Sequence, residues 1–167
     1  MSPEAVGDRL AVLYGDIQAT AMRGAPICNE ALAVEAVGFR DFAGYVLGVV
    51  VTPWFLNLIA AESQQIGRPA IPSSALRLRF PAGDVDFIVS ELRGFGRIAS
   101  CSLFSPMSGF ADQQAARAAA EAALCALFDA HLHEPPAAPQ PTPREGLDRR
   151  ALFGGRRSPP QSGEGAL

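Results

Sequence analysis

The sequence predicts an α+β fold: a single small domain in which an antiparallel sheet of about five strands packs with three helices, followed by a disordered tail. The 167 residues, 49% hydrophobic and 19% charged, suffice for one globular domain with its own core. Segments of alternating apolar and polar residues, separated by glycine- and proline-rich turns, predict strands in the middle of the chain. Apolar residues at helical spacing predict helices toward both ends of the domain.

Three segments are predicted to be helical. The first runs from about Pro3 to Met22, because Ser2 can cap it and its apolar residues recur at helical spacing. The last is an alanine-rich helix over residues 112–132, which Asp112 can cap. Between them, the apolar segment 53–62 is predicted to be a short central helix, because proline suits the first position of a helix.

The β-rich middle of the chain begins with residues 36–42 and 45–51, which a short turn at Gly44 joins into a predicted hairpin. Residues 75–80, 84–92 and 97–104 follow as a predicted antiparallel meander with one exposed face.

The longest apolar stretch is Tyr45 to Ala61, and its 17 residues reach the lower limit for a membrane span. Thr52, Pro53 and Asn57 interrupt it, so a buried strand followed by the short helix is predicted instead of a span. We therefore do not expect an integral membrane protein.

The composition changes at Glu134, which divides the chain into a domain of residues 1–133 and a tail of residues 134–167. The tail holds 7 of the 14 prolines, a composition that favours disorder. The domain has 9 arginines and 13 acidic residues, a net charge of −4, whereas the tail has 5 arginines and 4 acidic residues. The tail is therefore slightly basic and the domain acidic.

Charge and cysteine content exclude several classes of function. A net charge of −3 does not suggest the strongly basic surface that nucleic-acid binding requires. The three cysteines form no CxxC pair, so no zinc or iron knuckle and no cofactor is expected. Their odd number, with no secretory leader at the start, favours a reducing, cytoplasmic location.

No set of residues combines an acid, a base and a nucleophile, so we expect a non-enzymatic protein. His131 and His133 would point about 200° apart on a helix, which disfavours a shared metal ion. Cys101 lies among apolar neighbours in a predicted strand and Cys125 in the last helix, so both are expected to be buried and inert. A small thiol- or metal-handling protein that uses Cys101 and the two histidines remains an alternative.

Two segments are rich in aromatic and other large apolar residues, which can belong either to the core or to a binding surface. The first is Thr52-Pro53-Trp54-Phe55, and the second is the loop 102–110 with Phe104, Met107 and Phe110. Core anchoring explains both, but tryptophan, phenylalanine and methionine are also enriched where proteins bind partners. If the two segments meet, they form a hydrophobic groove.

The tail contains the sequence DRRALFGGRR, in which Leu152 and Phe153 lie between two pairs of arginines. A solvated basic run explains the arginines but not the apolar pair. A twin-arginine export signal would stand at the other end of the chain and be followed by an apolar segment. We therefore predict a short interaction element on a tether, which docks either on a partner or on the acidic domain itself.

Three stretches of the chain, GVVVTPWFLNLI, FPAGDVDFIVSELRGFGRIASCSLFSPMSGF and RRALFGGRR, resemble the [NiFe]-hydrogenase assembly chaperones of the HybE/HupJ type. The resemblance covers residues 36–128 and the tail motif. It implies a small α+β domain without catalytic residues. Some relatives are fused to a rubredoxin; this chain has no CxxC pair, so no iron is expected.

The resemblance also implies a function and partners. The expected role is a cytoplasmic accessory chaperone for an uptake hydrogenase, which binds the precursor of the small subunit, with its twin-arginine signal, the precursor of the large subunit, or both. It would protect these precursors under oxygen or hold back export until assembly is complete. The alternative from another class is a scaffold or interaction domain with a tail docking motif.

The motifs shared with that family, together with the neighbouring apolar residues, define the candidate partner contacts. They are Thr52, Pro53, Trp54, Phe55, Phe104, Ser105, Pro106, Met107, Arg149, Arg150, Leu152, Phe153, Arg156 and Arg157.

Overall fold

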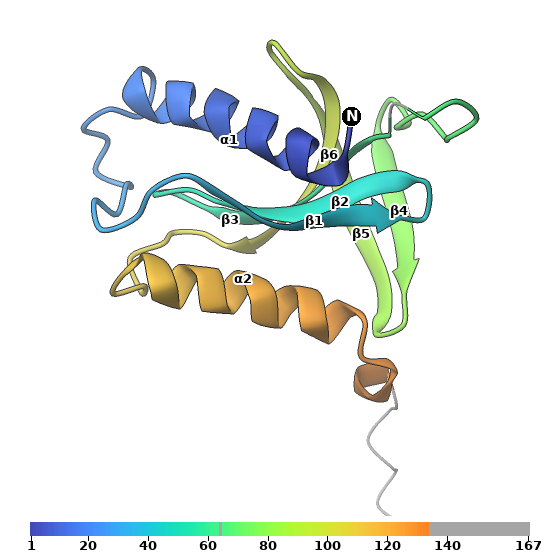
Figure 1. Cartoon of the computed structure of the whole chain (residues 1–167). Coiled ribbons are helices and arrows are strands. Elements are labelled where there is room, and N and C mark those ends of the chain that lie inside the picture. The colour runs from blue at the N-terminus through green and yellow to red at the C-terminus, as the bar shows by residue number, and fades with distance from the viewer. Residues whose placement is uncertain (64, 134–167) are drawn as a thin grey trace, which may run out of the picture. The chain divides into compact units, whose positions relative to one another are not determined.

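A computed structural model of the chain describes residues 1–63 and 65–133 (Figure 1). The tail, with its predicted disorder and its motif, lies outside the described residues. The elements in chain order are α1 (Pro3–Ala19), β1 (Glu35–Phe42), β2 (Tyr45–Val51), β3 (Leu56–Glu62), β4 (Ala75–Phe80), β5 (Gly83–Leu92), β6 (Gly96–Phe104), α2 (Gln113–Leu127) and a short 3-10 helix, η1 (Ala130–His133).

The described strands form one antiparallel sheet of six, in the order β1-β2-β3-β6-β5-β4. The α+β class, the hairpin β1–β2 and the β4–β5–β6 meander are as predicted. The sixth strand is β3, which lies at the centre of the sheet and joins the hairpin to the meander.

The prediction of a short central helix at 53–62 is wrong, because Leu56–Glu62 is strand β3. Leu58 and Ala60 face the core beneath α2, while Ile59 and Ala61 face the core beneath α1. A strand that is buried on both faces has a continuous apolar run, which periodicity cannot distinguish from a buried helix.

Both long helices begin at the predicted caps and end earlier than predicted. The Ser2 hydroxyl accepts a hydrogen bond of 3.3 Å from the Ala5 N–H, and the Asp112 carboxylate accepts one of 2.8 Å from the Ala115 N–H. Helix α1 stops at Ala19 instead of Met22, and α2 stops at Leu127, after which the chain forms η1.

The domain has three layers, with α1 on one face of the sheet and α2 on the other (Figure 1). Both helices lie over β1 and β2. The core beneath α1 contains Val6, Leu10, Tyr14, Val46, Val50, Ile59, Ala61 and Ile98. The larger core beneath α2 includes Leu47, Val49, Val51, Leu56, Leu58, Phe87, Met107, Ala116, Ala120 and Leu124. The face of the sheet beside α1 is therefore only partly covered, because the main contacts of that helix are with β1 and β2.

Two glycines make room for one aromatic ring between α1 and the sheet. The ring of Phe39 lies against Gly7 of α1 and Gly48 of β2, and a Cβ added to Gly48 would overlap that ring. Phe39 follows Gly38, whose φ of +64° lies in the left-handed region, and the pairing of β1 with β2 shifts at this point. The glycine thus forms a β-bulge that turns the ring toward α1.

The two edge strands of the sheet approach each other at one end of the domain. Phe42, at the end of β1, stacks on Phe80, at the end of β4, and both rings meet Phe128 edge to face after α2. The backbone N–H of Ala82 donates to the Leu127 carbonyl oxygen at 3.1 Å. The sheet therefore curls around the C-terminal end of α2.

Candidate partner-binding site

Three segments meet at the other end of the sheet: the loop after α1, the β2–β3 turn and the loop after β6. Asn29 connects them. Its backbone N–H donates to the Pro53 carbonyl oxygen at 2.8 Å, and its side-chain amide donates to the carbonyl oxygens of Met107 and Phe110 at 3.0 and 2.8 Å. The two segments that the sequence singled out for aromatic residues therefore do lie together, and we call this region the loop end.

The β2–β3 turn is built around the buried hydroxyl of Thr52. This oxygen accepts hydrogen bonds from the N–H groups of Trp54 and Phe55, at 3.2 and 2.9 Å, and donates one to the Phe55 carbonyl oxygen at 3.0 Å. Pro53 supplies a fixed φ at the second position of the turn, where proline is favoured. The predicted strand-to-helix corner is thus a hairpin turn.

The two aromatic residues of this turn belong partly to the core and partly to the surface. Phe55 packs edge to face against Tyr14 of α1, with ring centroids 5.4 Å apart, and Trp54 packs against Phe55 at 5.6 Å. Both residues are half-buried. The Ser105 hydroxyl donates to the Trp54 carbonyl oxygen at 3.4 Å, which links the turn to the loop after β6.

In that loop, Phe104, Ser105 and Pro106 are exposed, whereas Met107 is fully buried. The exposed fraction of Phe104 is 46%, and its ring packs against Phe110, edge to face at 5.3 Å. Three of the candidate contacts in the domain are therefore accessible to a partner: Phe104, Ser105 and Pro106. Two are partly accessible, Trp54 and Phe55. The other three are buried: Thr52, Pro53 and Met107. The six candidates in the tail lie outside the described residues.

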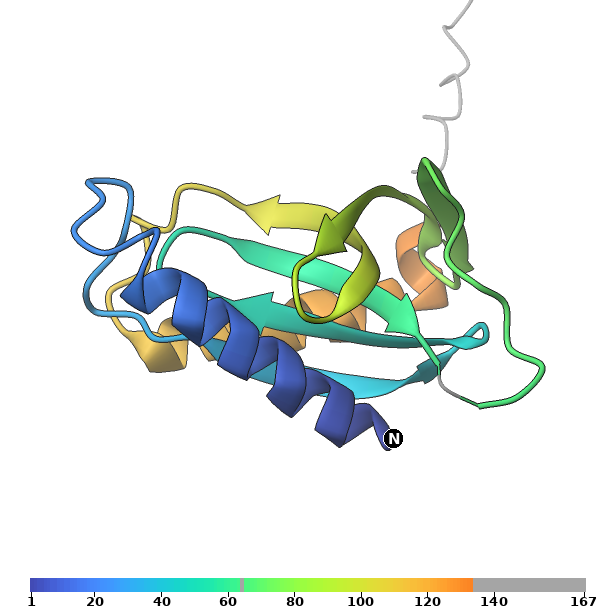
Figure 2. The ribbon, with the colours of Figure 1, turned by 90° about the horizontal axis from the view of Figure 1, so that it is seen from above.

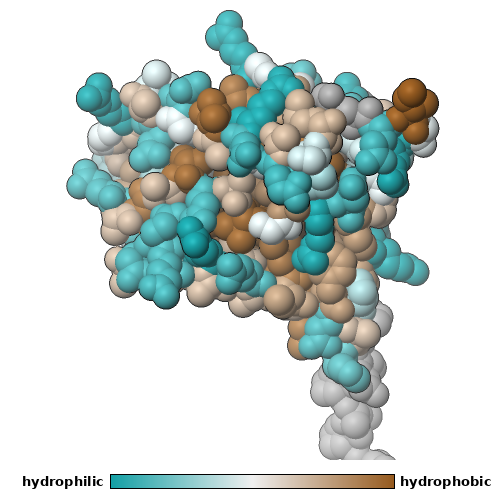
Figure 3. All heavy atoms as spheres, in the orientation of Figure 1, coloured by the Kyte–Doolittle hydropathy of each residue, from teal (hydrophilic) through white to brown (hydrophobic). Residues whose placement is uncertain are grey.

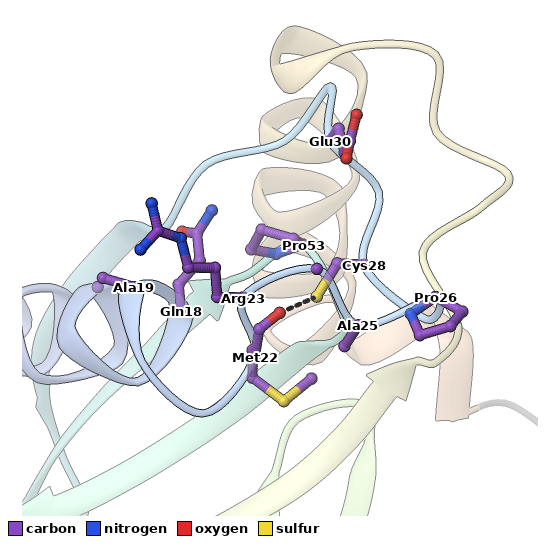
Figure 4. Close-up of a pocket in the computed structure, with 11 residues that line it drawn as sticks. Gln18, Ala19, Met22, Arg23, Ala25, Pro26, Cys28, Glu30 and Pro53 are labelled. Atoms are coloured by element: carbon purple, nitrogen blue, oxygen red, sulfur yellow. Dashed lines mark hydrogen bonds between the residues drawn. The ribbon is translucent and has the colours of Figure 1, made fainter.

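A hollow of about 770 Å³ lies beside the β2–β3 turn, between α1 and the loop that follows it (Figure 4). Its lining is Gly15, Gln18, Ala19, Met22, Arg23, Gly24, Ala25, Pro26, Cys28, Glu30 and Pro53. Figure 4 shows Gln18 and Arg23 on the helix side and Glu30 on the loop opposite. The Cys28 thiol donates to the Met22 carbonyl oxygen at 3.5 Å. No sequence pattern pointed to this hollow, because it depends on how the loop returns along the helix.

The part of the sheet that α1 leaves uncovered adjoins the loop end. Figure 2 shows α1 over β1 and β2, with β3 and β6 visible beside it. Here Asn57 pairs with Ser102, and Ser100 pairs with Ile88 across the next strand boundary. Ile88 is 76% exposed, an unusual position for isoleucine at the centre of a strand. Asn57 interrupts the apolar stretch of residues 45–61. This polar position was the feature of the sequence that could have indicated an incompletely covered face of the sheet.

The cysteines and histidines considered in the sequence lie in separate elements, Cys101 in β6, Cys125 in α2 and the two histidines in η1. Cys101 is half-buried, and burial raises the pKa of its thiol, with the nearby charge of Asp86 adding to the shift. Cys125, predicted to be buried, is exposed, because it lies on the outer side of α2. His131 and His133 are exposed on η1. In the part of the chain that the structure describes, no three histidine, cysteine or acidic residues are grouped as metal ligands.

The exposed side of β4 and β5 carries two ion pairs between arginine and aspartate. Asp86 accepts two hydrogen bonds from Arg77, and Asp84 accepts two from Arg79, on the exposed side of β4 and β5. Of the helices within residues 1–63 and 65–133, none has the length and hydrophobicity needed to cross a membrane.

Hydrophobic residues are not gathered into one broad patch on the side of the domain shown in Figure 3. The strongly hydrophobic residues there lie in small groups among hydrophilic ones. Large contiguous apolar patches are the usual mark of a binding surface. The side of the domain in Figure 3 does not carry this mark.

Several known proteins are similar to this chain in sequence. A hydrogenase expression/formation protein HupJ of Bradyrhizobium diazoefficiens is 55% identical over 122 residues, which are 73% of this chain and 71% of that protein. The protein HoxT of Cupriavidus necator is 36% identical over 154 residues, 84% of this chain and 83% of that protein. A probable rubredoxin HupJ of Rhodobacter capsulatus is 40% identical over 120 residues, 70% of this chain but 42% of that protein.

The fold has a counterpart among solved structures. The solution structure of HybE from Escherichia coli superposes with a TM-score of 0.59 at 26% identity, and the match covers 92% of this chain and 91% of that one. The family model described as [NiFe]-hydrogenase assembly, chaperone, HybE matches residues 5–155, which include the loop end and most of the tail motif. The chain therefore belongs to the HybE family of [NiFe]-hydrogenase assembly chaperones.

Proposed function

We propose that this protein is an accessory chaperone for [NiFe]-hydrogenase maturation, which binds an immature subunit without chemical turnover. Membership of the HybE family and the hydrogenase expression/formation relatives support the maturation role. The observation that supports binding is the loop end, where Asn29 joins the β2–β3 turn to the loop after β6. The joined segments carry the exposed ring of Phe104 and the half-buried ring of Trp54.

This arrangement suits a binding surface for physical reasons. Aromatic side chains that are already held by packing lose little conformational entropy when a partner covers them. The hydrogen bonds of Asn29 and Thr52 hold the backbone beneath the two rings, so the surface is largely preformed. A holding function needs only a higher affinity for the immature subunit than for the assembled enzyme.

The partner in this proposal is the precursor of the hydrogenase small subunit, which carries a twin-arginine signal, or the precursor of the large subunit. The hydrogenase is of the uptake type, and binding takes place in the cytoplasm before export. While bound, the precursor is protected from oxygen or held back from export until assembly is complete. No catalytic step and no cofactor is required.

The tail contributes a second contact in this proposal. Arg149, Arg150, Arg156 and Arg157 present paired guanidinium groups that bind carboxylates in a two-pronged geometry. Leu152 and Phe153 lie between them and would enter an apolar pocket of the precursor. The family model extends to residue 155, which supports a role for this segment.

The first experiment measures the binding of the full chain to purified small-subunit and large-subunit precursors. The original chain should bind at least one of them, and Phe104→Ala and Trp54→Ala should each weaken binding about tenfold or more, as expected for aromatic anchors. Ile66→Ala is the control, because Ile66 is fully exposed in the β3–β4 loop, away from the loop end. If neither precursor is bound, the proposed function is wrong.

A genetic experiment tests the biological role. Deletion of the gene in its host should lower hydrogenase activity, and the loss should be larger in the presence of oxygen if protection is the main task. Unchanged activity under both conditions would rule out a role in maturation.

The tail contact is tested separately with a chain in which the four arginines are replaced by alanine. Precursor binding should weaken and should lose part of its dependence on salt concentration, because screened ionic contacts are removed. Replacing Leu152 and Phe153 by serine should weaken binding without changing the salt dependence. Equal affinity for all three chains would show that the tail makes no contact.

A further inference from the structure

A second hollow, of about 400 Å³, lies at the loop end between the loop after α1 and the loop after β6. It shares Pro26, Cys28 and Glu30 with the hollow of Figure 4, so the two hollows adjoin along the segment 26–30. Both loops lie at the end of the domain where α1 ends and α2 begins (Figure 1). Ile27 lines the second hollow from the first loop and Phe110 from the second loop. We call it the Ile27 hollow.

The Ile27 hollow continues the apolar surface of the loop end and is accessible from outside. Ile27 is 49% exposed, although isoleucine is among the residues most often buried. The half-buried ring of Phe110 lines the hollow and packs on the exposed ring of Phe104 at 5.3 Å. Large apolar side chains from two loops therefore border one open depression, and Ile27, which no sequence motif singled out, is one of them.

The polar groups of Asn29 and Cys28, which line the Ile27 hollow, already have partners within the domain. The Asn29 amide donates to the carbonyl oxygens of Met107 and Phe110, and its oxygen accepts a hydrogen bond of 3.0 Å from the Ala31 N–H. The Cys28 thiol donates to a carbonyl oxygen of its own loop. A polar ligand would have to compete with these bonds, whereas an apolar side chain leaves all of them intact. The hollow is therefore complementary to an apolar side chain.

One charged group lines the Ile27 hollow, the carboxylate of Glu30. Glu30 is exposed, and within residues 1–63 and 65–133 its side chain makes no hydrogen bond or ion pair. Arg23 lies across the first hollow from Glu30 (Figure 4), but it does not line the second hollow. A basic group of a partner would meet the Glu30 carboxylate with a modest attraction, because both charges lie at the surface. The charge at this hollow therefore favours a basic neighbour of the bound side chain over an acidic one.

We propose that the Ile27 hollow receives a large apolar side chain of the immature hydrogenase subunit, next to a basic residue that faces Glu30. This inference rests on the proposed function and deepens it, because it states the chemistry of the bound segment and adds Ile27 to the contact residues. The bound side chain packs between Ile27 and Phe110 and continues the contact made by Phe104. A central apolar anchor in a pocket of this kind carries much of the binding energy in protein interfaces.

The decisive experiment fills the hollow with a side chain of the protein itself. Ala31 is exposed and lines the hollow, so Ala31→Phe adds a ring there without removing a contact. We expect the full chain with this change to lose at least tenfold in affinity for the purified precursor, with a melting temperature no lower than that of the original chain. Ala33→Phe is the matched control and should bind normally, because Ala33 is also exposed but does not line the hollow. Normal binding by the Ala31→Phe chain would overturn the inference.

Variants at Ile27 and Glu30 test the chemistry of the bound side chain. Ile27→Asp should weaken precursor binding at least tenfold and Ile27→Leu should preserve it, whereas Leu132→Asp, the control at an exposed leucine of η1, should bind normally. Equal affinities of the two Ile27 variants would contradict an apolar contact. Glu30→Lys should weaken binding several-fold, and more at low than at high salt concentration, because salt screens the repulsion. Tighter binding by Glu30→Lys would contradict a basic neighbour.

The possible outcomes separate this inference from the proposed function. If the original chain binds a precursor and the variants at positions 27 and 31 bind equally well, the hollow is not the contact, and the proposed function stands. If the original chain binds no precursor, both are wrong.

Two other occupants of the hollow are tested with the same chains. Sedimentation of the chain without a precursor should be unchanged by Ile27→Asp, and a dimer that this change dissociates would identify a second copy as the occupant. Replacing Leu152 and Phe153 by serine should not strengthen precursor binding, since a gain would identify the tail as a competitor for the hollow. Either result would overturn the inference.

Discussion

Phe42 and Phe80 stack with ring centroids 4.7 Å apart and ring planes 10° apart, although they belong to the two opposite edge strands of the sheet. An open sheet of six strands would keep its edges far apart. Here the edges converge at one end, and the ring of Phe128 closes the contact from α2. The curvature of the sheet therefore depends on a small aromatic cluster.

Replacing Phe80 by alanine should destabilise the domain by about 3–5 kcal/mol, the range observed when buried aromatic residues are truncated. Phe80 is only 3% exposed and packs against both partner rings, so the loss combines buried area with a cavity. Chemical denaturation measures the change. Phe104→Ala is the matched control, since its ring is half in solvent and its loss should cost much less. Equal losses would show that the cluster does not hold the edges together.

Asn29→Asp tests the connection at the loop end with almost no change of shape. The carboxylate can still accept the hydrogen bond of 3.0 Å from the Ala31 N–H, but it can no longer donate to the carbonyl oxygens of Met107 and Phe110. We expect a loss of roughly 1–3 kcal/mol in unfolding free energy, because two partly buried carbonyl oxygens lose the amide donor of Asn29.

The control for Asn29→Asp is Glu30→Gln at the neighbouring exposed position, where the unfolding free energy should change by less than about 0.5 kcal/mol. Precursor binding should also weaken in Asn29→Asp, since the loop after β6, which follows Phe104, is no longer tied to the residue whose backbone N–H holds the β2–β3 turn. An Asn29→Asp chain with normal stability and normal binding would contradict the linking role of this residue.

Thr52→Val should destabilise the domain by roughly 1–3 kcal/mol, whereas Thr52→Ser should be close to neutral. Valine has the shape of threonine but leaves the N–H groups of Trp54 and Phe55 without their acceptor in a buried turn. Serine keeps the hydroxyl. Thermal unfolding of the three chains measures the difference, and a valine variant as stable as the serine variant would show that the hydroxyl is dispensable.

The thiol of Cys101 should react more slowly in the folded chain than in the unfolded chain, and the pH midpoint of its alkylation should lie higher. Burial raises the pKa of this thiol above its ordinary value of 9.0, because the thiolate is disfavoured away from water. The stability linked to this group is therefore complete below about pH 9 and declines as the pH rises through the folded-state pKa.

The measurement uses a chain with Cys28→Ser and Cys125→Ser, so that Cys101 is the one remaining thiol, and follows iodoacetamide labelling in buffer and in urea. A folded-state midpoint below that of the unfolded chain would revive the alternative of a thiol-handling protein. The exposed Cys125, left alone in a second variant, should be labelled readily and serves as the reference.

The sequence predicted most of the fold because its signals were local. Ser2 and Asp112 cap the helices as expected, and the alternating pattern of β4 to β6 was legible because one face of those strands is exposed. Strand β3 was misassigned because the cores beneath α1 and α2 bury both of its faces, whereas the pairing that makes it a strand comes from β2 and β6. Leucine and alanine in this segment also favour helices when considered alone.

The candidate site was predictable only in part, for a related reason. Composition identified the two aromatic segments, but their contact depends on Asn29, which lies in a loop without any periodic pattern. The exposure of Ile88 follows from how far α1 extends across the sheet, which no single stretch of sequence specifies. Local patterns thus predict elements, whereas surfaces require the arrangement of elements in space.

The contact between Phe39 and Gly48 has a consequence for the evolution of the family. Any side chain at position 48 would occupy the space of the ring, so the two positions cannot change independently. A lineage that acquires alanine or serine at position 48 must also replace the phenylalanine at position 39 by a smaller residue. An aligned set of homologues should therefore show paired substitutions at these two positions, and their joint variation would record the spacing between α1 and the sheet.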